Sequence, residues 1–168
     1  ELREIHLPGM KAGVFAGAAG CMAAYNEVDG IPCHANPKLL TDILREEWEF
    51  DGVVMADGGA IDRLLMQAGD YESAASLALY AGVDLSLWDT AFTTLEKAVE
   101  LGKVEESFID RAVRRVLKLK FSLGLFDQPY TDENRFIDAV NSRAFKQTNL
   151  QVARESVVLL KNNNTEYK

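Results

Sequence analysis

The stretch DGVVMADGGAID, residues 51–62, decides how this sequence is interpreted. Four apolar residues, 53–56, run directly into Asp57, and two glycines follow at once. A short apolar run between turn residues is typical of a strand that is buried on both faces, as in a parallel sheet. The sequence therefore places a carboxylate where a buried strand ends and a flexible turn begins.

Outward from this stretch, strand-like runs alternate with helical patterns. Apolar runs at 20–25 and 83–88 are predicted to be strands, and residues 26–32 a loop. Asn36-Pro37 and Gly82 are start and stop signals for helices. Helices are predicted at residues 1–18 with a break near Pro8 and Gly9, and at 38–49, 71–80, 91–101, 105–123 and 142–154, and a last strand at 156–162. This order predicts an α/β fold with a parallel sheet covered by helices on both faces. Three such strands are too few to close a barrel, so we expect the chain to be part of something larger.

Composition and charge limit the function classes. The 48% hydrophobic content of the 168 residues suffices for one core, and the net charge of −8 argues against nucleic acid as a partner. No apolar run approaches the roughly 20 residues that span a bilayer, so no membrane association is predicted. Because the first residue is Glu1 and not Met, we expect the native start to be absent. The compartment stays open, with a slight preference for the cytoplasm.

Three neighbouring predicted strands each present a polar side chain. Tyr25 ends the first, Asp57 follows the second and Asp84 lies early in the third, so we expect all three near one edge of the sheet. Asp57-Gly58 can also be read as an ordinary turn, or with Gly59 as a phosphate cradle, although no P-loop lysine follows. For Asp84 a structural role, in which it accepts hydrogen bonds from backbone amides, is favoured.

A single aspartate at a strand end has limited chemistry. It is a poor general base at its ordinary pKa, but a good nucleophile toward an oxocarbenium-like carbon. Glycoside cleavage uses this property together with a second carboxyl group as the acid. A metal-assisted lyase or an aldolase would need a ligand cluster or a Schiff-base lysine; His6 falls on a predicted helix and His34 in a loop, so neither a metal nor a cofactor is predicted.

Several motifs resemble glycoside hydrolase family 3. The segment MAAYNEVDGIPCHANPKLLTDILREEWEFDGVVMADGGAI, residues 22–61, is similar to the part of the family that carries the nucleophile. The family pattern there is a Ser-Tyr-Asn turn, an Asn-Pro-x-Leu-Leu helix, Trp-x-Phe-Asp-Gly, and a Val-Val-Ser-Asp-Trp strand end. The resemblance continues in YAGVDLSLW (80–88), VEESFIDRAVRRVLKLKFSLGLFDQPY (104–130) and ARESVVLLKNN (153–163), and so covers nearly the whole chain.

The resemblance implies a fold and a site. Residues 1–127 would be the C-terminal portion of a (β/α)8 TIM barrel, 128–141 a linker, and 142–168 the start of an α/β sandwich domain. Asp57 takes the place of the catalytic nucleophile. Tyr25 matches the tyrosine that helps hold its carboxylate, and Met22 matches a position that lines the sugar site.

The sequence departs from the family pattern beside the nucleophile. Gly58 stands where the family usually has Trp, and Ala56 where it has Ser. The aromatic wall against the sugar is therefore missing or comes from elsewhere, for which Trp88 is a candidate. Sugar preference cannot be carried across these changes.

The function that the resemblance implies is a retaining β-glycosidase, similar to β-glucosidases, that hydrolyses O-glycosidic bonds in carbohydrate catabolism. The partners are a carbohydrate substrate and the remainder of the same polypeptide or a complementary chain, which would supply the general acid; a homo-oligomer is left open. One alternative is a catalytically incomplete chain that only completes a fold. Another is a β-xylosidase or N-acetylglucosaminidase of the same family. The 168 residues alone are expected to be inactive.

Overall fold

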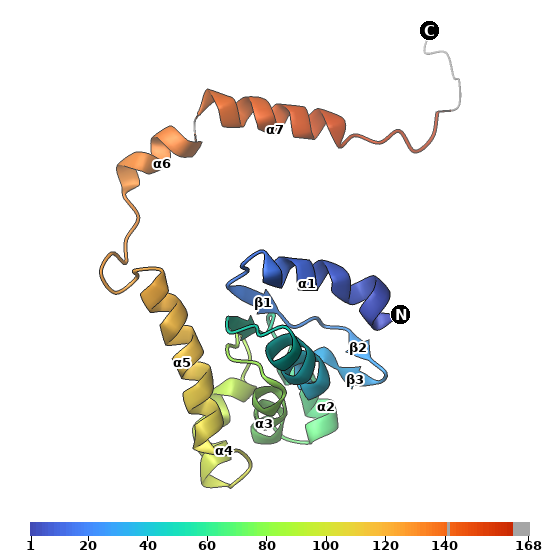
Figure 1. Cartoon of the computed structure of the whole chain (residues 1–168), viewed down its shortest axis with the longest axis vertical. Helices are drawn as coiled ribbons and strands as arrows, with labels where there is room; N and C mark the ends of the chain where they lie inside the picture. The colour runs from blue at the N-terminus through green and yellow to red at the C-terminus, as the bar shows by residue number, and fades with distance from the viewer. Residues whose placement is uncertain (141, 163–168) are drawn as a thin grey trace. The chain divides into compact units, whose positions relative to one another are not determined.

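A computed structural model describes residues 1–140 and 142–162 of the chain (Figure 1). The chain divides into two units, Glu1–Phe126 and Asp127–Lys168. The first unit contains η1 (Leu2–His6), α1 (Leu7–Phe15), β1 (Gly20–Met22), β2 (Glu27–Val28), β3 (Ile31–Pro32), η2 (Cys33–Ala35), η3 (Lys38–Glu47), β4 (Val53–Met55), η4 (Asp62–Leu64), α2 (Leu65–Ala68), α3 (Tyr71–Ala81), η5 (Ala91–Thr94), α4 (Leu95–Glu100) and α5 (Glu106–Ser122). The second unit contains α6 (Glu133–Val140) and α7 (Arg143–Glu155).

Three extended segments of the first unit run parallel to one another. β1 pairs with β4 in the register Gly20–Val53, Cys21–Val54 and Met22–Met55. On the other side of β4, Met55 forms a parallel bridge with Leu85, and the Ala56 N–H donates to the Leu85 carbonyl at 2.8 Å. The predicted parallel pairing is confirmed. The predicted third strand at 83–88 is reduced to this bridge and to the bonds from the Asp84 and Leu85 N–H groups to the Val54 carbonyl.

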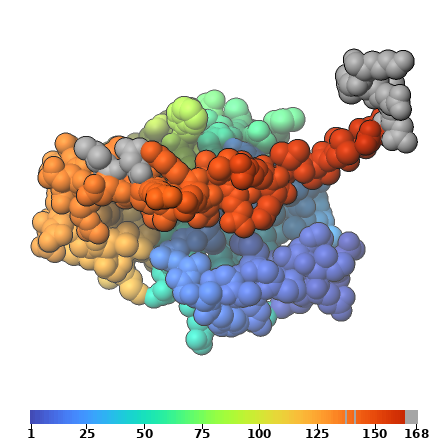
Figure 2. All heavy atoms as spheres, turned by 90° about the horizontal axis from the view of Figure 1, so that it is seen from above, coloured from blue at the N-terminus to red at the C-terminus, as the bar shows by residue number. Residues whose placement is uncertain are grey.

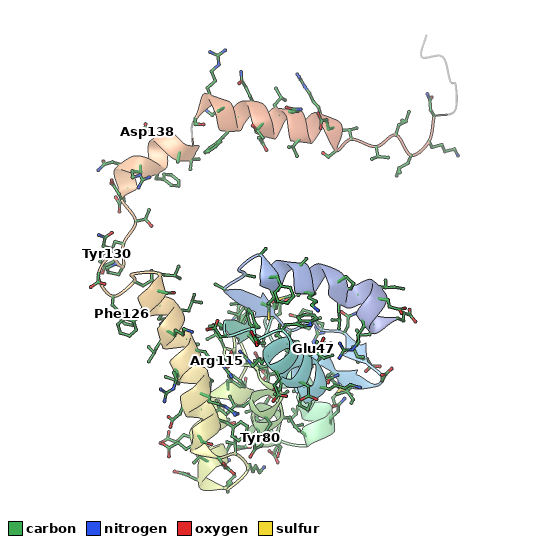
Figure 3. The ribbon with its side chains drawn as sticks, in the orientation of Figure 1. Glu47, Tyr80, Arg115, Phe126, Tyr130 and Asp138 are labelled. Carbon is green, nitrogen blue, oxygen red and sulfur yellow. The ribbon has the colours of Figure 1, made fainter. Side chains whose placement is uncertain are left out.

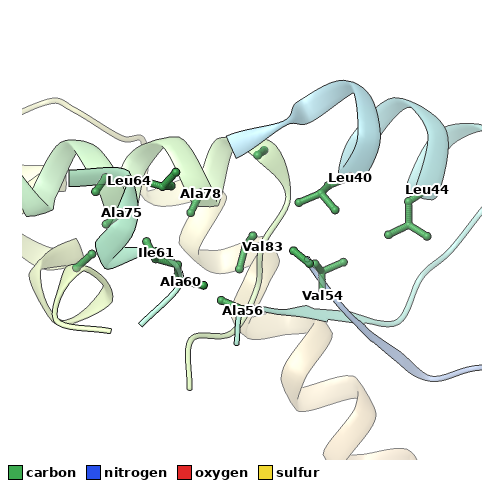
Figure 4. Packing of buried hydrophobic residues seen from close by; sticks show 14 of the residues in the cluster. Leu40, Leu44, Val54, Ala56, Ala60, Ile61, Leu64, Ala75, Ala78 and Val83 are labelled. Atoms are coloured by element: carbon green, nitrogen blue, oxygen red, sulfur yellow. The ribbon is translucent and has the colours of Figure 1, made fainter. Parts of the chain in front are cut away.

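The core lies between this small sheet and the helices. Leu40 and Leu44 of η3 point toward Val54 and Val83 (Figure 4). Together with Ile61, Val54 and Val83 are at most 1% exposed, and burying each such side chain contributes about 1.5–3 kcal/mol. Val54 and Val83 are thus covered as a parallel α/β arrangement predicts.

Helix ends follow the predicted signals. The Asn36 Oδ1 accepts from the Leu39 N–H at 3.1 Å and caps η3, and Gly82 ends α3 with a φ of 118°. The predicted break in the N-terminal helix is not found: η1 continues directly into α1, and His6 and Leu7 at the junction both have helical backbone angles. This N-terminal segment, blue in the space-filling view, lies at the surface (Figure 2). No helix in residues 1–140 or 142–162 combines the length and apolar character needed to cross a membrane.

Two further local predictions were wrong, and the predicted linker contains a helix. Residues 26–32, predicted as a loop, form the hairpin β2–β3, whose turn residues Asp29 and Gly30 have φ values of 53° and 78°. The predicted linker contains α6, because Phe136 and Val140 are four residues apart on one helix face. The predicted strand at 156–162 has no strand structure, since nothing in the described chain pairs with it.

Candidate functional site at the end of strand β4

The turn after β4 brings Asp57 and Tyr25 together. Asp57 is half-buried, and its Oδ1 accepts a hydrogen bond from the Gly58 N–H at 2.7 Å. Tyr25, which follows β1, donates its phenol O–H to the Gly58 carbonyl at 2.8 Å. The parallel register of β1 and β4 makes this contact possible, because the two strands end at the same edge of the sheet.

Electrostatics also couple the two side chains. Partial loss of solvent contact, and after it the nearby Asp57 carboxylate with its negative charge, raises the pKa of Tyr25 above its ordinary value, while Arg63 opposes the rise. The phenol therefore stays protonated at neutral pH and can act as a hydrogen-bond donor.

Arg63 and His34 flank Tyr25, and neither was predicted to belong to the site. The Arg63 guanidinium carbon lies 4.3 Å from the centroid of the Tyr25 ring, which is a cation–π contact. The His34 ring is 6.1 Å from the same ring and is buried, with an Nε2 that has no hydrogen-bond partner among the described residues. Burial lowers the pKa of His34, although Asp89 and Asp57 oppose this. These neighbours come from tertiary packing, and no sequence motif marks them.

The other two predicted residues lie differently. Met22 is the last residue of β1, pairs in register with Met55 and is 48% exposed. Asp84 is not at the edge that carries Asp57, so this expectation was wrong: its N–H bonds the Val54 carbonyl, three residues before Asp57.

The Asp84 side chain has the structural role that was favoured for it. Oδ2 accepts from the Val54 N–H at 2.9 Å and from Arg45, and Oδ1 accepts from Arg115 at 2.8 Å. In Figure 3, Arg115 extends from α5 toward the other helices of the first unit. Asp84 thus joins β4, η3 and α5 by charge-assisted hydrogen bonds.

Two further aspartates connect the turn after β4 to the loop before η5. The Asp62 N–H donates to Asp89 Oδ1 at 2.9 Å, and the Asp62 carboxylate accepts from the N–H groups of Thr90 and Ala91 at 3.0 and 2.8 Å. Asp89 Oδ2 also accepts from the Ser86 hydroxyl at 2.6 Å. We call this reciprocal pair the Asp62–Asp89 clasp. Each loop uses its carboxylate to bind the backbone of the other, so their relative position is fixed.

The donor set does not favour a metal. In the described part of the chain, no group of three His, Cys, Asp or Glu side chains is close enough to hold a metal ion. What the site offers is one carboxylate at a strand end, a phenol donor beside it, and a cation over the phenol ring. This arrangement suits attack by the carboxylate on an electrophilic carbon.

Comparison with known proteins agrees with this chemistry. The model of the glycosyl hydrolase family 3 N terminal domain matches residues 1–119. The chain is 41% identical to the periplasmic beta-glucosidase of Salmonella typhimurium, over 94% of this chain and 22% of that protein. It is 39% identical to a putative beta-xylosidase of Formosa agariphila, over 96% and 22% of the two chains. The crystal structure of a beta-glucosidase from Listeria innocua superposes with a TM-score of 0.87 at 37% identity, over 99% of this chain and 24% of that one.

The chain therefore belongs to glycoside hydrolase family 3, which confirms the resemblance found in its motifs. It spans about a fifth of the length of these relatives.

Proposed function

We propose that this chain carries the nucleophile of a retaining β-glycosidase, and that the nucleophile is Asp57. The observation that supports this most is the meeting of Asp57 and Tyr25 at the carboxyl ends of two parallel strands. In barrel enzymes, reactive side chains gather at this face. We also propose that residues 1–127 are the C-terminal part of a (β/α)8 barrel, that 128–141 connect it to the next domain, and that 142–168 begin an α/β sandwich.

The proposed reaction has two steps. The Gly58 N–H holds Asp57 Oδ1, so we assign the attack on the anomeric carbon to Oδ2. The bond from this carbon to the leaving oxygen breaks while an acid outside the chain donates a proton to that oxygen, leaving a glycosyl ester on Asp57. Water then attacks the same carbon, the former acid takes its proton, and the sugar is released with retained configuration. The two carboxyl groups should lie about 5–5.5 Å apart in the assembled site.

Tyr25 would position the nucleophile. Its O–H bond to the Gly58 carbonyl holds the peptide that immediately follows Asp57, and so restricts the backbone from which the carboxylate projects. Met22, at the exposed end of β1, would line the sugar site.

The substrate class is a β-glycoside. Structures of the Listeria innocua beta-glucosidase include complexes with glucose and gluconolactone, which makes a glucoside the first substrate to test. A β-xyloside is the second candidate, because a putative beta-xylosidase matches this chain almost as well as a beta-glucosidase does. Aryl β-glucoside, β-xyloside and N-acetyl-β-glucosaminide assayed side by side would separate the three sugars.

The decisive experiment is covalent labelling of the full-length polypeptide. A mechanism-based 2-fluoro-sugar should form a stable ester on Asp57, visible as a mass increase of the peptide that contains it. Asp57→Asn should abolish both labelling and turnover. A label on any other residue would refute the assignment. Full-length protein that turns over no glycoside and takes up no label would favour the alternative of a fold-completing chain, and turnover by the 168 residues alone would contradict the need for an acid from outside.

A further inference from the structure

Trp88 is an exposed aromatic side chain packed beside the residue that follows Asp57. Its side chain is 85% exposed, yet its ring lies directly against Gly58. A methyl group placed on Gly58 would lie 3.0 Å from Trp88 Cε3, closer than ordinary van der Waals contact allows. A side chain at position 58 would therefore require the indole to move by a few tenths of an ångström.

The position of Trp88 is fixed by its neighbours in sequence. Asp89 is buried and belongs to the Asp62–Asp89 clasp, and Ser86 donates its hydroxyl to the same carboxylate. Because the loop is bonded on both sides of Trp88, its backbone is held while the ring remains open to solvent. An exposed ring on a fixed backbone loses little conformational entropy when it binds a ligand.

The surroundings of the ring fit a sugar. Trp88 lines an open cavity of about 600 Å³ formed by the loop from Asp84 to Thr93, and at the same time contacts the loop that carries Asp57. A volume in this range is ordinary for a small-molecule site. One face of a pyranose ring carries only C–H groups, and a flat indole supplies matching apolar area.

We propose that Trp88 is a specificity-determining residue of this protein: its indole is the aromatic platform for the sugar bound at Asp57, and Gly58 is the space that admits it. This inference rests on the proposed glycosidase function. It assigns the platform to the loop before η5 and not to the turn after β4, so the platform and the nucleophile come from different loops joined by the clasp.

The test compares three variants of the full-length polypeptide on an aryl β-glucoside. Trp88→Ala should raise KM about tenfold, with kcat changed less than threefold, because a binding surface is lost while the reacting groups stay in place. Trp88→Tyr should keep KM within about threefold of the wild type, since a flat ring remains. Met66→Ala removes another large exposed side chain, 95% accessible on α2, and should leave both constants unchanged.

Each other outcome decides against the platform. A Trp88→Ala variant with the KM of the wild type, or one whose kcat falls while KM is unchanged, would overturn it, as would a Trp88→Tyr variant as impaired as Trp88→Ala. Labelling by the 2-fluoro-sugar separates this failure from failure of the proposed function. If the wild type and Trp88→Ala both label at Asp57, the glycosidase assignment stands whatever happens to KM; if the wild type does not label, that assignment fails first and the platform with it.

Discussion

Replacing Asp84 with Asn is expected to destabilise the first unit strongly, even though the two side chains have the same shape. The Asp84 side chain is 1% exposed and forms ion pairs with Arg45, which is 8% exposed, and Arg115, which is 25% exposed. The amide oxygen of Asn can still accept from the Val54 N–H, but its NH₂ group faces guanidinium donors. Asp84→Asn thus removes the negative charge that compensates two partly or fully buried cations.

The size of the effect follows from burial. Leaving one buried charge without its partner costs about 3–5 kcal/mol, and Arg45 is such a charge. Arg115 adds at most about 1 kcal/mol, because water reaches a quarter of its side chain. Part of the Arg45 loss is offset by its bonds to the carbonyls of Phe50 and Gly52. We expect a loss of about 3–4 kcal/mol, which lowers the urea midpoint by about 1.5–2 M for an m-value of about 2 kcal/mol/M.

Urea unfolding followed by Trp48 fluorescence measures this loss, because Trp48 is 5% exposed and reports on the core. Asp51→Asn is the matched control. It makes the same chemical change in an ion pair with Lys118 whose side chains are 79% and 65% exposed, and should leave the midpoint unchanged. Adding Arg45→Met to Asp84→Asn should recover part of the loss by removing the uncompensated cation. If Asp84→Asn unfolds at the same urea concentration as Asp51→Asn, the argument from burial is wrong.

Three further outcomes are expected. Tyr25→Phe should lower kcat/KM on an aryl β-glycoside about fivefold to tenfold and leave the urea midpoint unchanged, because the variant loses only a partly exposed hydrogen bond beside the proposed nucleophile. An unchanged kcat/KM would contradict the positioning role of Tyr25. The folded state lowers the pKa of His34, so as the pH falls the unfolded chain takes up this proton at a higher pH than the folded chain does. The free energy of unfolding should therefore fall between pH 7 and pH 5. The urea midpoint should fall less over this range in His34→Phe than in the control His6→Gln. In urea unfolding, Gly82→Ala should cost about 2–3 kcal/mol and Gly102→Ala about 1 kcal/mol. Both glycines have positive φ, but only at Gly82 would the added methyl meet a threonine hydroxyl of η3, at 3.1 Å. Equal losses in the two variants would show that the crowding at Gly82 is relieved.

The sequence was sufficient to predict that Asp57 and Tyr25 lie close together, because its signals there are local. The apolar run 53–56 predicts a buried strand, and Asp57 necessarily follows it. The proximity of Tyr25 follows from parallel pairing, which alternating strands and helices already imply. By contrast, Arg63, His34 and the clasp depend on how loops far apart in the sequence meet, and no periodicity reports that.

Some misses had a signal in the sequence and some did not. Asp29-Gly30 between the apolar residues Val28 and Ile31 is a strong hairpin signal. Both turn residues have the left-handed φ that this signal predicts, so the hairpin could have been predicted from the sequence. The final apolar run, 156–162, fails for a different reason. Its composition suits a strand, but a strand needs a partner, and within the described residues none is in place.

Two aspartates beside β4, Asp84 and Asp57, have different electrostatic surroundings. The Val54 N–H of β4 binds the Asp84 carboxylate, which two arginines neutralise. Three residues later, Asp57 accepts from the Gly58 N–H, and the Tyr25 phenol donates to the Gly58 carbonyl. Charge compensation by cations stabilises Asp84 but would weaken Asp57 as the proposed nucleophile, because a paired carboxylate is a weaker electron donor. Arg63 illustrates this difference: it lies over the ring of Tyr25 and forms no ion pair with Asp57 within 4.0 Å in the described chain. Substitutions at the Asp84 end should therefore change stability, and those at the Asp57 end should change turnover.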